Sequence, residues 1–482
     1  MAQSSDSSTD QTISIAIACL CRQHTFTAPS VPVSSLPLKA TTCHCDSCRY
    51  STGALYASDA PWPGDPGEVR NASSLARYAF SDLITILFCG TCGSTLFFEE
   101  KPRGSDAEAK GEPSSFGVFT GALPNVQVPG GGPLVAWTHH MFLGDTRDGG
   151  ASPWLRTLNY TRDSEDGGRA SAGGCKFATS RRWLGRRLES DEIPQAEDWP
   201  PITTSPSALE DLSAATKDLS LTQDKQAQQQ QQQDDDDITI PVRCRCGGVD
   251  LELLASAASR EFSQMPRAQL PRIVDPHSNK PIASFDVCDS CRLVSGVDIF
   301  HWTFYQLRHI AFAKGNNAAT GQKQQQDGEE GRGLPKSTAE LKKAVLADEA
   351  ERDPRLGTLR LYASSPDVQR YFCGKCSAVV FYAVDDLPDQ VDVALGLLRA
   401  PPAGQNSSDK GGHGGARAEH LLSWKYGGKM GWRQDTEGGW RDEMLKIVER
   451  DVTAWRDRRG LQKNWRIINE EKEVAAKKGA DE

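Results

Sequence analysis

The chain has 482 residues, a formal net charge of −9 and a sequence pI of about 5.6. Domains usually run to roughly 100 to 200 residues, so this length predicts two to four folded units. The acidic balance argues against non-specific binding to nucleic acids or membrane surfaces, because both attract clustered positive charge. No stretch reaches the roughly 18 to 20 apolar residues that a membrane helix needs, and residues 1–11 are polar. We therefore expect a cytoplasmic protein, with the nucleus as the alternative, and no nucleic-acid or membrane partner.

The sequence contains 14 cysteines, most of them in closely spaced groups. Reducing compartments keep thiols free, so such groups are typical of metal ligands rather than of disulfides. Short runs of β-branched and aromatic residues, bounded by Gly, Pro, Asp or Ser, predict a mainly antiparallel β fold. The predicted strands, in chain order, are residues 13–19, 83–88, 94–98, 358–363 and 378–383.

The first and last cysteine pairs of the N-terminal region predict a closed metal site. Cys19 and Cys21 flank one residue at the end of a predicted strand, and side chains alternate along a strand, so both sulfurs point the same way. Cys89 and Cys92 have a glycine between them and another after them, which allows a tight turn. Four thiolates predict a structural zinc site with no open position. The alternative is four buried, reduced cysteines without metal.

Three further sulfurs come from Cys43, Cys45 and Cys48. Three protein ligands leave the fourth corner of a zinc site open, as in catalytic sites. A substrate thiol at that corner would become a nucleophilic thiolate at neutral pH. His44 lies between two ligands on an extended segment, so its side chain is expected to point away from the metal. Arg49 is expected to hold a substrate carboxylate, to balance the charge of the ligands or to be solvated.

Residues 159–237 are rich in Ser, Gly, Pro and charged residues and end in a run of Gln followed by a run of Asp. This composition predicts a disordered, solvated linker. Its apolar segment, residues 182–184, is a candidate for docking onto a folded unit. Cys175 also lies in the linker and is expected to be an ordinary free thiol.

The cysteine pattern then recurs, with a second set of outer pairs that predicts another closed zinc site. These four residues are Cys244, Cys246, Cys373 and Cys376. The middle set is altered, because its members are Asp286, Cys288 and Cys291. An aspartate oxygen is a harder ligand than sulfur, so we expect partial or no zinc occupancy there. A working Asp-Cys-Cys site and simple packing of the two cysteines both remain open.

The repeat predicts two tandem modules, residues 12–158 and residues 238–430. Polar, Gln-rich and Gly-rich sequence predicts a disordered insertion in the second module over about 314–345. Apolar residues at helical spacing predict a C-terminal helix within residues 438–475, packed either on its own domain or on a partner.

The pattern resembles the family of glutathione-dependent formaldehyde-activating enzymes and centromere protein V. Its hallmarks are Cys-x-Cys, Cys-His-Cys-x-x-Cys-Arg and Phe-Cys-x-x-Cys-Gly, and all three stand in the N-terminal copy as Cys19–Cys21, Cys43–Arg49 and Phe88–Gly93. The glycine that usually follows the first pair is present as Gly247 in the second copy but is Arg22 in the first, which leaves that turn open to question.

The resemblance implies β-tent modules, a structural zinc on the outer cysteines and a second zinc on the middle three that binds glutathione-type thiols. It also implies carbon–sulfur lyase chemistry that forms or splits S-hydroxymethylglutathione, with Cys43, Cys45 and Cys48 as the catalytic ligands. We expect roughly two to four zinc ions per chain. The alternative is a non-catalytic zinc scaffold or interaction protein, and the sequence carries no signal for the oligomeric state.

Overall fold

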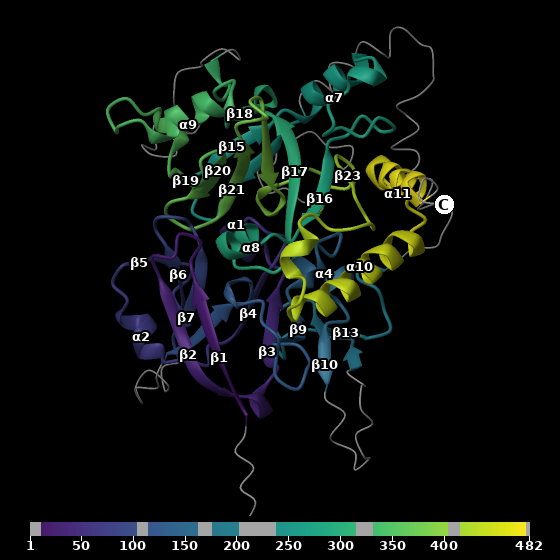
Figure 1. Cartoon of the computed structure of the whole chain (residues 1–482). Helices are drawn as coiled ribbons and strands as arrows, with labels where there is room; N and C mark the ends of the chain where they lie inside the picture. Colours follow the sequence, from purple (N-terminus) through teal and green to yellow (C-terminus); the bar gives the residue numbers. More distant parts are fainter. Residues whose placement is uncertain are drawn as a thin grey trace, which may run out of the picture.

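The computed structural model describes residues 11–103, 114–161, 176–201, 238–314, 331–402 and 415–478. Residues 11–201 are termed the N-terminal half and residues 238–478 the C-terminal half. Each half contains one large sheet, of nine and of seven strands (Figure 1). The prediction of a mainly β protein is confirmed. No helix of the described residues is long and apolar enough to cross a membrane.

The strands of the N-terminal half are β1 Thr12–Ala18, β2 Thr25–Pro32, β3 Leu38–Cys43, β4 Ala57–Pro61, β5 Leu75–Ala79, β6 Ile84–Cys89, β7 Thr95–Glu100, β8 Ser115–Phe119, β9 Val135–Met141, β10 Asn159–Thr161, β11 Lys176–Ala178, β12 Arg181–Trp183 and β13 Glu192–Ile193. Its helices are α1 Asp46–Thr52, α2 Pro66–Asn71 and α4 Ser152–Leu155. The nine-stranded sheet has the order β13-β12-β9-β3-β4-β8-β7-β6-β5. β1 pairs with β2, and β10 pairs with β11, as two separate antiparallel hairpins.

The strands of the C-terminal half are β14 Ile240–Arg243, β15 Asp250–Leu253, β16 Ile282–Asp286, β17 Phe300–Gln306, β18 Ile310–Phe312, β19 Leu359–Ser365, β20 Val368–Cys373, β21 Val379–Val384, β22 Gln390–Ala394 and β23 Ser423–Trp424. Its helices are α7 Ala255–Gln264, α8 Asp289–Ser295, α9 Thr338–Leu346, α10 Arg441–Arg458 and α11 Trp465–Lys478. The seven-stranded sheet has the order β19-β20-β21-β22-β17-β16-β23, beside a smaller sheet of β14, β15 and β18.

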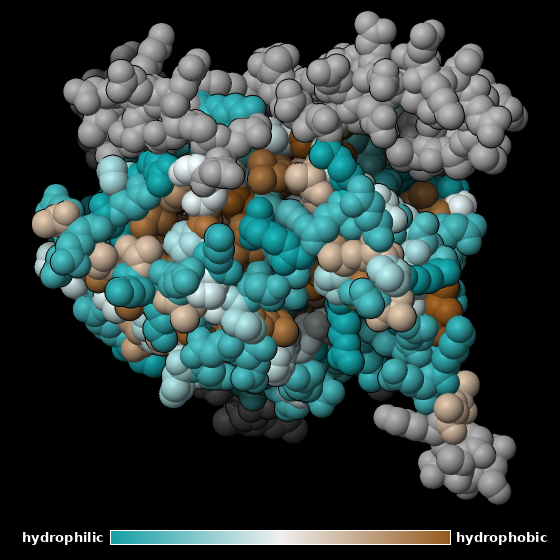
Figure 2. All heavy atoms as spheres, turned by 90° about the horizontal axis from the view of Figure 1, so that it is seen from above, coloured by the Kyte–Doolittle hydropathy of each residue, from teal (hydrophilic) through white to brown (hydrophobic). Residues whose placement is uncertain are grey.

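Burial alternates along β1 as its sequence predicts. Ile15 and Ile17 are buried, and so is Cys19 just after the strand, whereas Ser14 and Ala16 are exposed. Since side chains of a strand alternate between its faces, the same alternation that buries the isoleucines turns Cys19 inward. Most buried apolar residues of the described chain form one core that runs through both halves, and Ala57, Ile86 and Phe119 form a smaller cluster. Figure 2, which looks onto the C-terminal half, shows mainly hydrophilic residues on the described surface.

The two halves meet through a reciprocal contact between a helix end and a 3₁₀ turn. The N–H of Gly396 donates to the carbonyl of Gly53, just after α1, over 2.9 Å. In the counterpart, the N–H of Gly121 donates to the carbonyl of Gly296, just after α8, also over 2.9 Å. A Cβ atom on Gly396 would lie 2.0 Å from the carbonyl oxygen of Ala54, so only glycine fits. Both cysteine-bearing helices therefore lie at the junction of the halves (Figure 1).

A buried ion pair attaches the long helix α10 to both halves. Arg441 Nε lies 2.8 Å from Asp298 Oδ1, and these side chains are 0% and 2% exposed. The Thr120 hydroxyl donates to Asp298 Oδ2 over 2.6 Å, and Arg441 Nη2 donates to the Thr120 carbonyl over 2.8 Å. Since Thr120 belongs to the N-terminal half and Asp298 to the C-terminal half, the three residues connect both halves to the start of α10.

The structure differs from the predicted linker, because residues 159–161 and 176–193 contribute β10 to β13. β12 pairs in parallel with β9 and extends the large sheet. Trp183 is 2% exposed, and its ring centroid lies 5.4 Å from that of His139 on β9. Burial of this large ring offsets the entropy lost when the polar segment is ordered. Cys175 and the Gln and Asp runs lie outside the described residues.

The predicted insertion also differs in part, because α9 lies within residues 331–346. The Ser337 hydroxyl accepts a hydrogen bond from the N–H of Glu340 over 3.2 Å and so caps the helix. Leu341 is 0% exposed and Val345 is 6% exposed, so the helix buries an apolar stripe. Residues 315–330 of the predicted insertion lie outside the described part of the chain.

The predicted C-terminal helix is confirmed, and it is found as two helices. α10 ends at Arg458, and Gly460 with a φ of 63° separates it from α11. Met444, Val448 and Val452 on α10 are at most 1% exposed. α10 packs against α4 of the same chain, so its apolar face is covered from within the molecule.

Gly396→Ala should destabilise the protein by about 1 to 3 kcal/mol, because the added methyl group overlaps the backbone of Ala54 and forces the halves apart. The matched control is Gly333→Ala, where no atom lies within 4 Å of the added Cβ. Urea unfolding would measure both variants. Equal unfolding midpoints for the two variants would contradict the close contact.

Asp298→Ala should lower the free energy of unfolding by about 3 to 5 kcal/mol, because it leaves the Arg441 guanidinium buried and unpaired. The control is Glu443→Ala, which removes an exposed ion pair with Lys446 and should not measurably change the unfolding midpoint. A small effect of Asp298→Ala, with α10 still protected from proteolysis, would show that this ion pair does not anchor the helix.

Candidate functional site

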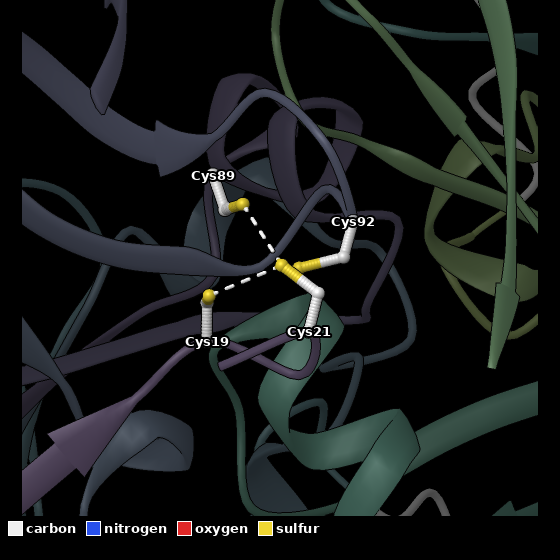
Figure 3. Close-up of side chains that lie close together, drawn as sticks. All are labelled: Cys19, Cys21, Cys89 and Cys92. Carbon is white, nitrogen blue, oxygen red and sulfur yellow. Dashed lines mark hydrogen bonds between the residues drawn. The ribbon is translucent and has the colours of Figure 1, made fainter. Parts of the chain in front are cut away.

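The outer cysteines of the N-terminal half form a compact cluster. In Figure 3 the sulfurs of Cys19, Cys21, Cys89 and Cys92 point toward one another, and all four lie within 4.8 Å of each other. The Cys21 sulfur lies 3.4 Å from that of Cys19 and 3.6 Å from that of Cys89. Sulfurs bound to a tetrahedral zinc at about 2.3 Å are about 3.8 Å apart. The cluster therefore has the size of a four-cysteine zinc site.

Tight turns hold these cysteines in place. Cys89 and Cys92 lie on the turn between β6 and β7, where Gly93 has a φ of 78° and donates its N–H to the Cys89 carbonyl over 2.9 Å. Arg22 after the first pair has a φ of 63°, and Gly247 at the matching position of the second copy has a φ of 71°. The turn is thus kept although arginine replaces glycine, in a backbone region that is strained for a side chain of this size.

The outer cysteines of the C-terminal half form a cluster of the same kind, with all four sulfurs within 4.8 Å. The sulfur of Cys246 lies 3.6 Å from that of Cys244 and 3.5 Å from that of Cys373. The N–H of Val249 donates to the Cys244 sulfur over 3.3 Å. Hydrogen bonds from neighbouring thiols lower the pKa of Cys373, which favours the thiolate that metals bind.

The middle cluster of the N-terminal half lies where β3 leads into α1. The sulfurs of Cys43, Cys45 and Cys48 lie within 4.8 Å of one another. Cys45 caps α1, because its sulfur accepts a hydrogen bond from the N–H of Cys48 over 3.3 Å. Hydrogen bonds from the Cys43 and Cys48 thiols lower the pKa of Cys45 to about 3. All three side chains are half-buried, as is Cys21 of the outer cluster, whereas Cys19, Cys89 and Cys92 are buried.

His44 is not part of this cluster. Its side chain is 0% exposed, and its Nε2 lies 3.0 Å from Nδ1 of His140 on β9. Burial lowers the pKa of His44 to about 3, so the ring is neutral at physiological pH. The alternation of side chains along the extended segment accounts for its inward direction.

Arg49 is buried rather than solvated, with 3% of its surface exposed. Its Nη2 lies 2.6 Å from Asp46 Oδ1, while Nε and Nη1 have no hydrogen-bond partner among the described residues. Its counterpart Arg292 on α8 instead donates from Nη1 to the carbonyls of Gly121 and Leu123 in the N-terminal half. Nε and Nη1 of Arg49 therefore remain without a partner among the described residues, whereas Nη1 of Arg292 forms hydrogen bonds that join the two halves.

A second guanidinium reaches this region from the C-terminal half. The Arg399 guanidinium carbon lies 4.3 Å from the centroid of the Tyr50 ring on α1, and Arg49 lies 5.1 Å from the same centroid. Both cations thus pack on the helix that carries Cys48. Sequence reasoning missed Arg399, because only the packing of the two halves brings it to α1.

Asp145 was also missed by sequence reasoning. It lies on the turn after β9, and burial, followed by the charges of Cys45 and Asp46, raises its pKa. Phe142, three residues earlier, has a φ of 58°, and Trp432 of the C-terminal half has a φ of 60°. A sequence comparison of the two halves could have found Asp145. In both halves an aspartate follows an aromatic residue by three positions, as Asp145 follows Phe142 and Asp435 follows Trp432.

The middle cluster of the C-terminal half places an oxygen of Asp286 and the sulfurs of Cys288 and Cys291 within 4.8 Å of one another. Cys288 caps α8, as its sulfur accepts a hydrogen bond from the N–H of Cys291 over 3.2 Å. Asp286 Oδ1 accepts a hydrogen bond from the N–H of Cys288 over 2.9 Å. Arg370 on β20 places Nη1 3.5 Å from the Cys291 sulfur.

All 14 predicted ligands are thus brought together in four groups of donor atoms that could hold metal ions. Residues 14–111 match the protein family described as glutathione-dependent formaldehyde-activating enzyme, so the N-terminal half carries a domain of this family. The match does not extend to the C-terminal half. No curated protein and no solved structure matches the chain significantly.

Cys89→Ser should make the protein insoluble or protease-sensitive, because it opens a four-sulfur cluster in which three cysteines are buried and weakens the folding energy linked to metal binding. Cys48→Ser changes a half-buried cluster and should leave the fold intact. Limited proteolysis and circular dichroism of the two variants would compare them. If both variants behave alike, the division into closed and open clusters is wrong.

Proposed function

Since residues 14–111 form a domain of the glutathione-dependent formaldehyde-activating enzyme family, we propose that the chain is a zinc-dependent carbon–sulfur lyase acting on adducts of glutathione and formaldehyde. The single observation that carries this proposal is the set of three half-buried thiols of Cys43, Cys45 and Cys48, which has one donor fewer than the four-cysteine clusters. Three donors suit a metal with a free position, whereas four donors close it.

The proposed organisation is two copies of one module, residues 12–158 and residues 238–430, each with an outer and a middle cluster. The matching clusters and the reciprocal glycine contact between the halves support it. Under this proposal the outer cysteines hold structural zinc, and Cys43, Cys45 and Cys48 hold the reactive zinc. The cytoplasm is the proposed location.

The proposed reaction joins a thiol to an aldehyde. A bond forms between the thiol sulfur and the carbonyl carbon, the carbonyl π bond breaks, and the thiol proton ends on the resulting hydroxyl oxygen. In the reverse direction, the carbon–sulfur bond breaks and the proton returns to sulfur. A zinc ion at the middle cluster would lower the pKa of a thiol bound at its open position.

Residues around the cluster fit the parts of such a substrate. Asp145 lies on the turn after β9, and burial, followed by the negative charges of Cys45 and Asp46, raises the pKa of its carboxyl group. Glutathione bears two carboxylates, and the positively charged guanidinium groups of Arg49 and Arg399 both pack on the Tyr50 ring of α1. Arg49 also has two N–H groups without a hydrogen-bond partner in the described part of the chain.

Cys45→Ala should abolish the formation of S-hydroxymethylglutathione, because it removes the central ligand of the half-exposed cluster. Cys288→Ala, the control at the matching position of the second copy, should leave most of the activity. Exchange spectroscopy by NMR would measure the rate of adduct formation above the uncatalysed rate.

Zinc content measured on the same samples separates loss of metal from loss of fold. Activity that survives Cys45→Ala but disappears with Cys288→Ala would move the reactive centre to the C-terminal half. Wild-type protein with full zinc content and no rate above background would favour the non-catalytic scaffold.

A further inference from the structure

The two middle clusters occupy matching positions but have different neighbours. Arg370 stands three residues before Cys373 and pairs across the sheet with Tyr382. Ile86 stands three residues before Cys89 and pairs in the same way with Phe98. Ile86 belongs, with Ala57 and Phe119, to a small apolar cluster against which Cys48 packs, so the matching strand position lies near the middle cysteines in both halves. The neutral side chain of the first copy is thus replaced by a cation in the second.

Three contacts fix the Arg370 guanidinium against the cysteines. Nη1 lies 3.5 Å from the Cys291 sulfur, and Nε donates to the hydroxyl of Ser364 over 3.0 Å. The guanidinium carbon lies 5.0 Å from the centroid of the Tyr382 ring. Arg370 is 8% exposed, and arginine stays protonated in proteins. A permanent positive charge is therefore part of this cluster.

The acidic ligand of the cluster is already engaged by protein groups. Asp286 Oδ1 accepts the hydrogen bond from the N–H of Cys288. Burial raises the pKa of this carboxyl group, and the positive charge of Arg370 acts in the opposite direction. The guanidinium thus balances negative charge that a metal ion would otherwise balance. A divalent ion among these donors would lie close to the guanidinium, and two cations in a buried site repel each other strongly.

The cluster is also more enclosed than its counterpart. Cys288 is 7% exposed and Cys291 is 3% exposed, whereas Cys43, Cys45 and Cys48 are all half-buried. Arg370 contacts the Cys291 sulfur and packs on the Tyr382 ring, so its side chain occupies space beside the buried sulfurs. The described residues around this cluster therefore do not fit the open zinc site that the family pattern implies.

We propose that the middle cluster of the C-terminal half binds no zinc, because the Arg370 guanidinium is the resident cation there and closes the site. The chain then holds about three zinc ions, one in each outer cluster and one in the middle cluster of the N-terminal half. Under this proposal, Arg370 is the residue that makes the middle cluster of the C-terminal half differ from that of the N-terminal half. This inference does not depend on the lyase activity, since it concerns metal content alone.

Native mass spectrometry and elemental analysis of the full chain, purified under reducing conditions without chelator, test the proposal. Wild-type protein should carry about three zinc ions, and Cys288→Ala/Cys291→Ala should carry the same number, whereas Cys43→Ala/Cys48→Ala should lose one. These measurements do not require any change at Arg370. Four ions in the wild type, or the loss of one ion from Cys288→Ala/Cys291→Ala, would overturn the proposal.

The second arm replaces Arg370 by the residue at the matching position of the first copy. Arg370→Ile should bind about one additional zinc ion, and Arg370→Met, which keeps much of the side-chain length without the charge, should do so too. The additional ion should disappear when Cys291→Ala is added. Unchanged or reduced zinc content in both soluble variants would show that Arg370 does not exclude the metal.

Discussion

The structure depends on the backbone contact between Gly53 and Gly396 and on its counterpart between Gly121 and Gly296. Each contact seats the end of a cysteine-bearing helix on a turn of the opposite half, at a separation that no Cβ atom allows. The two middle clusters consequently lie at a shared junction. The surroundings of the N-terminal cluster, including Arg399, are completed by the C-terminal half.

The two middle clusters lie at matching positions of the backbone but are surrounded by side chains of different charge. In the N-terminal half, Cys48 packs against a small apolar cluster that includes Ile86, and the three middle cysteines are half-buried. In the C-terminal half, Arg370 contacts Cys291 and the cysteines are buried. The two halves therefore share the grouping of outer and middle donor residues and differ in the side chains around the middle group.

Composition alone did not identify the ordered parts of the predicted linker and of the predicted insertion. Residues 176–193 and 331–346 are polar, yet Trp183 and Leu341 each bury an apolar side chain against the rest of the chain. A few well-placed apolar side chains are enough to order a polar segment, because burial of one large side chain is worth roughly 1.5 to 3 kcal/mol. Average composition does not reveal such contacts, since they depend on a surface formed elsewhere in the sequence.

The sequence by itself determined the strands that carry the cysteines, the apolar face of α10 and the grouping of the outer and middle cysteines. These features are local, because side chains alternate along a strand and short turns bring neighbours together. Only the tertiary structure decided that Arg370 contacts Cys291, 79 residues away in the chain, and that Arg399 reaches the Tyr50 ring. Such contacts depend on strand register and on the packing of the halves, and no spacing within the sequence encodes them.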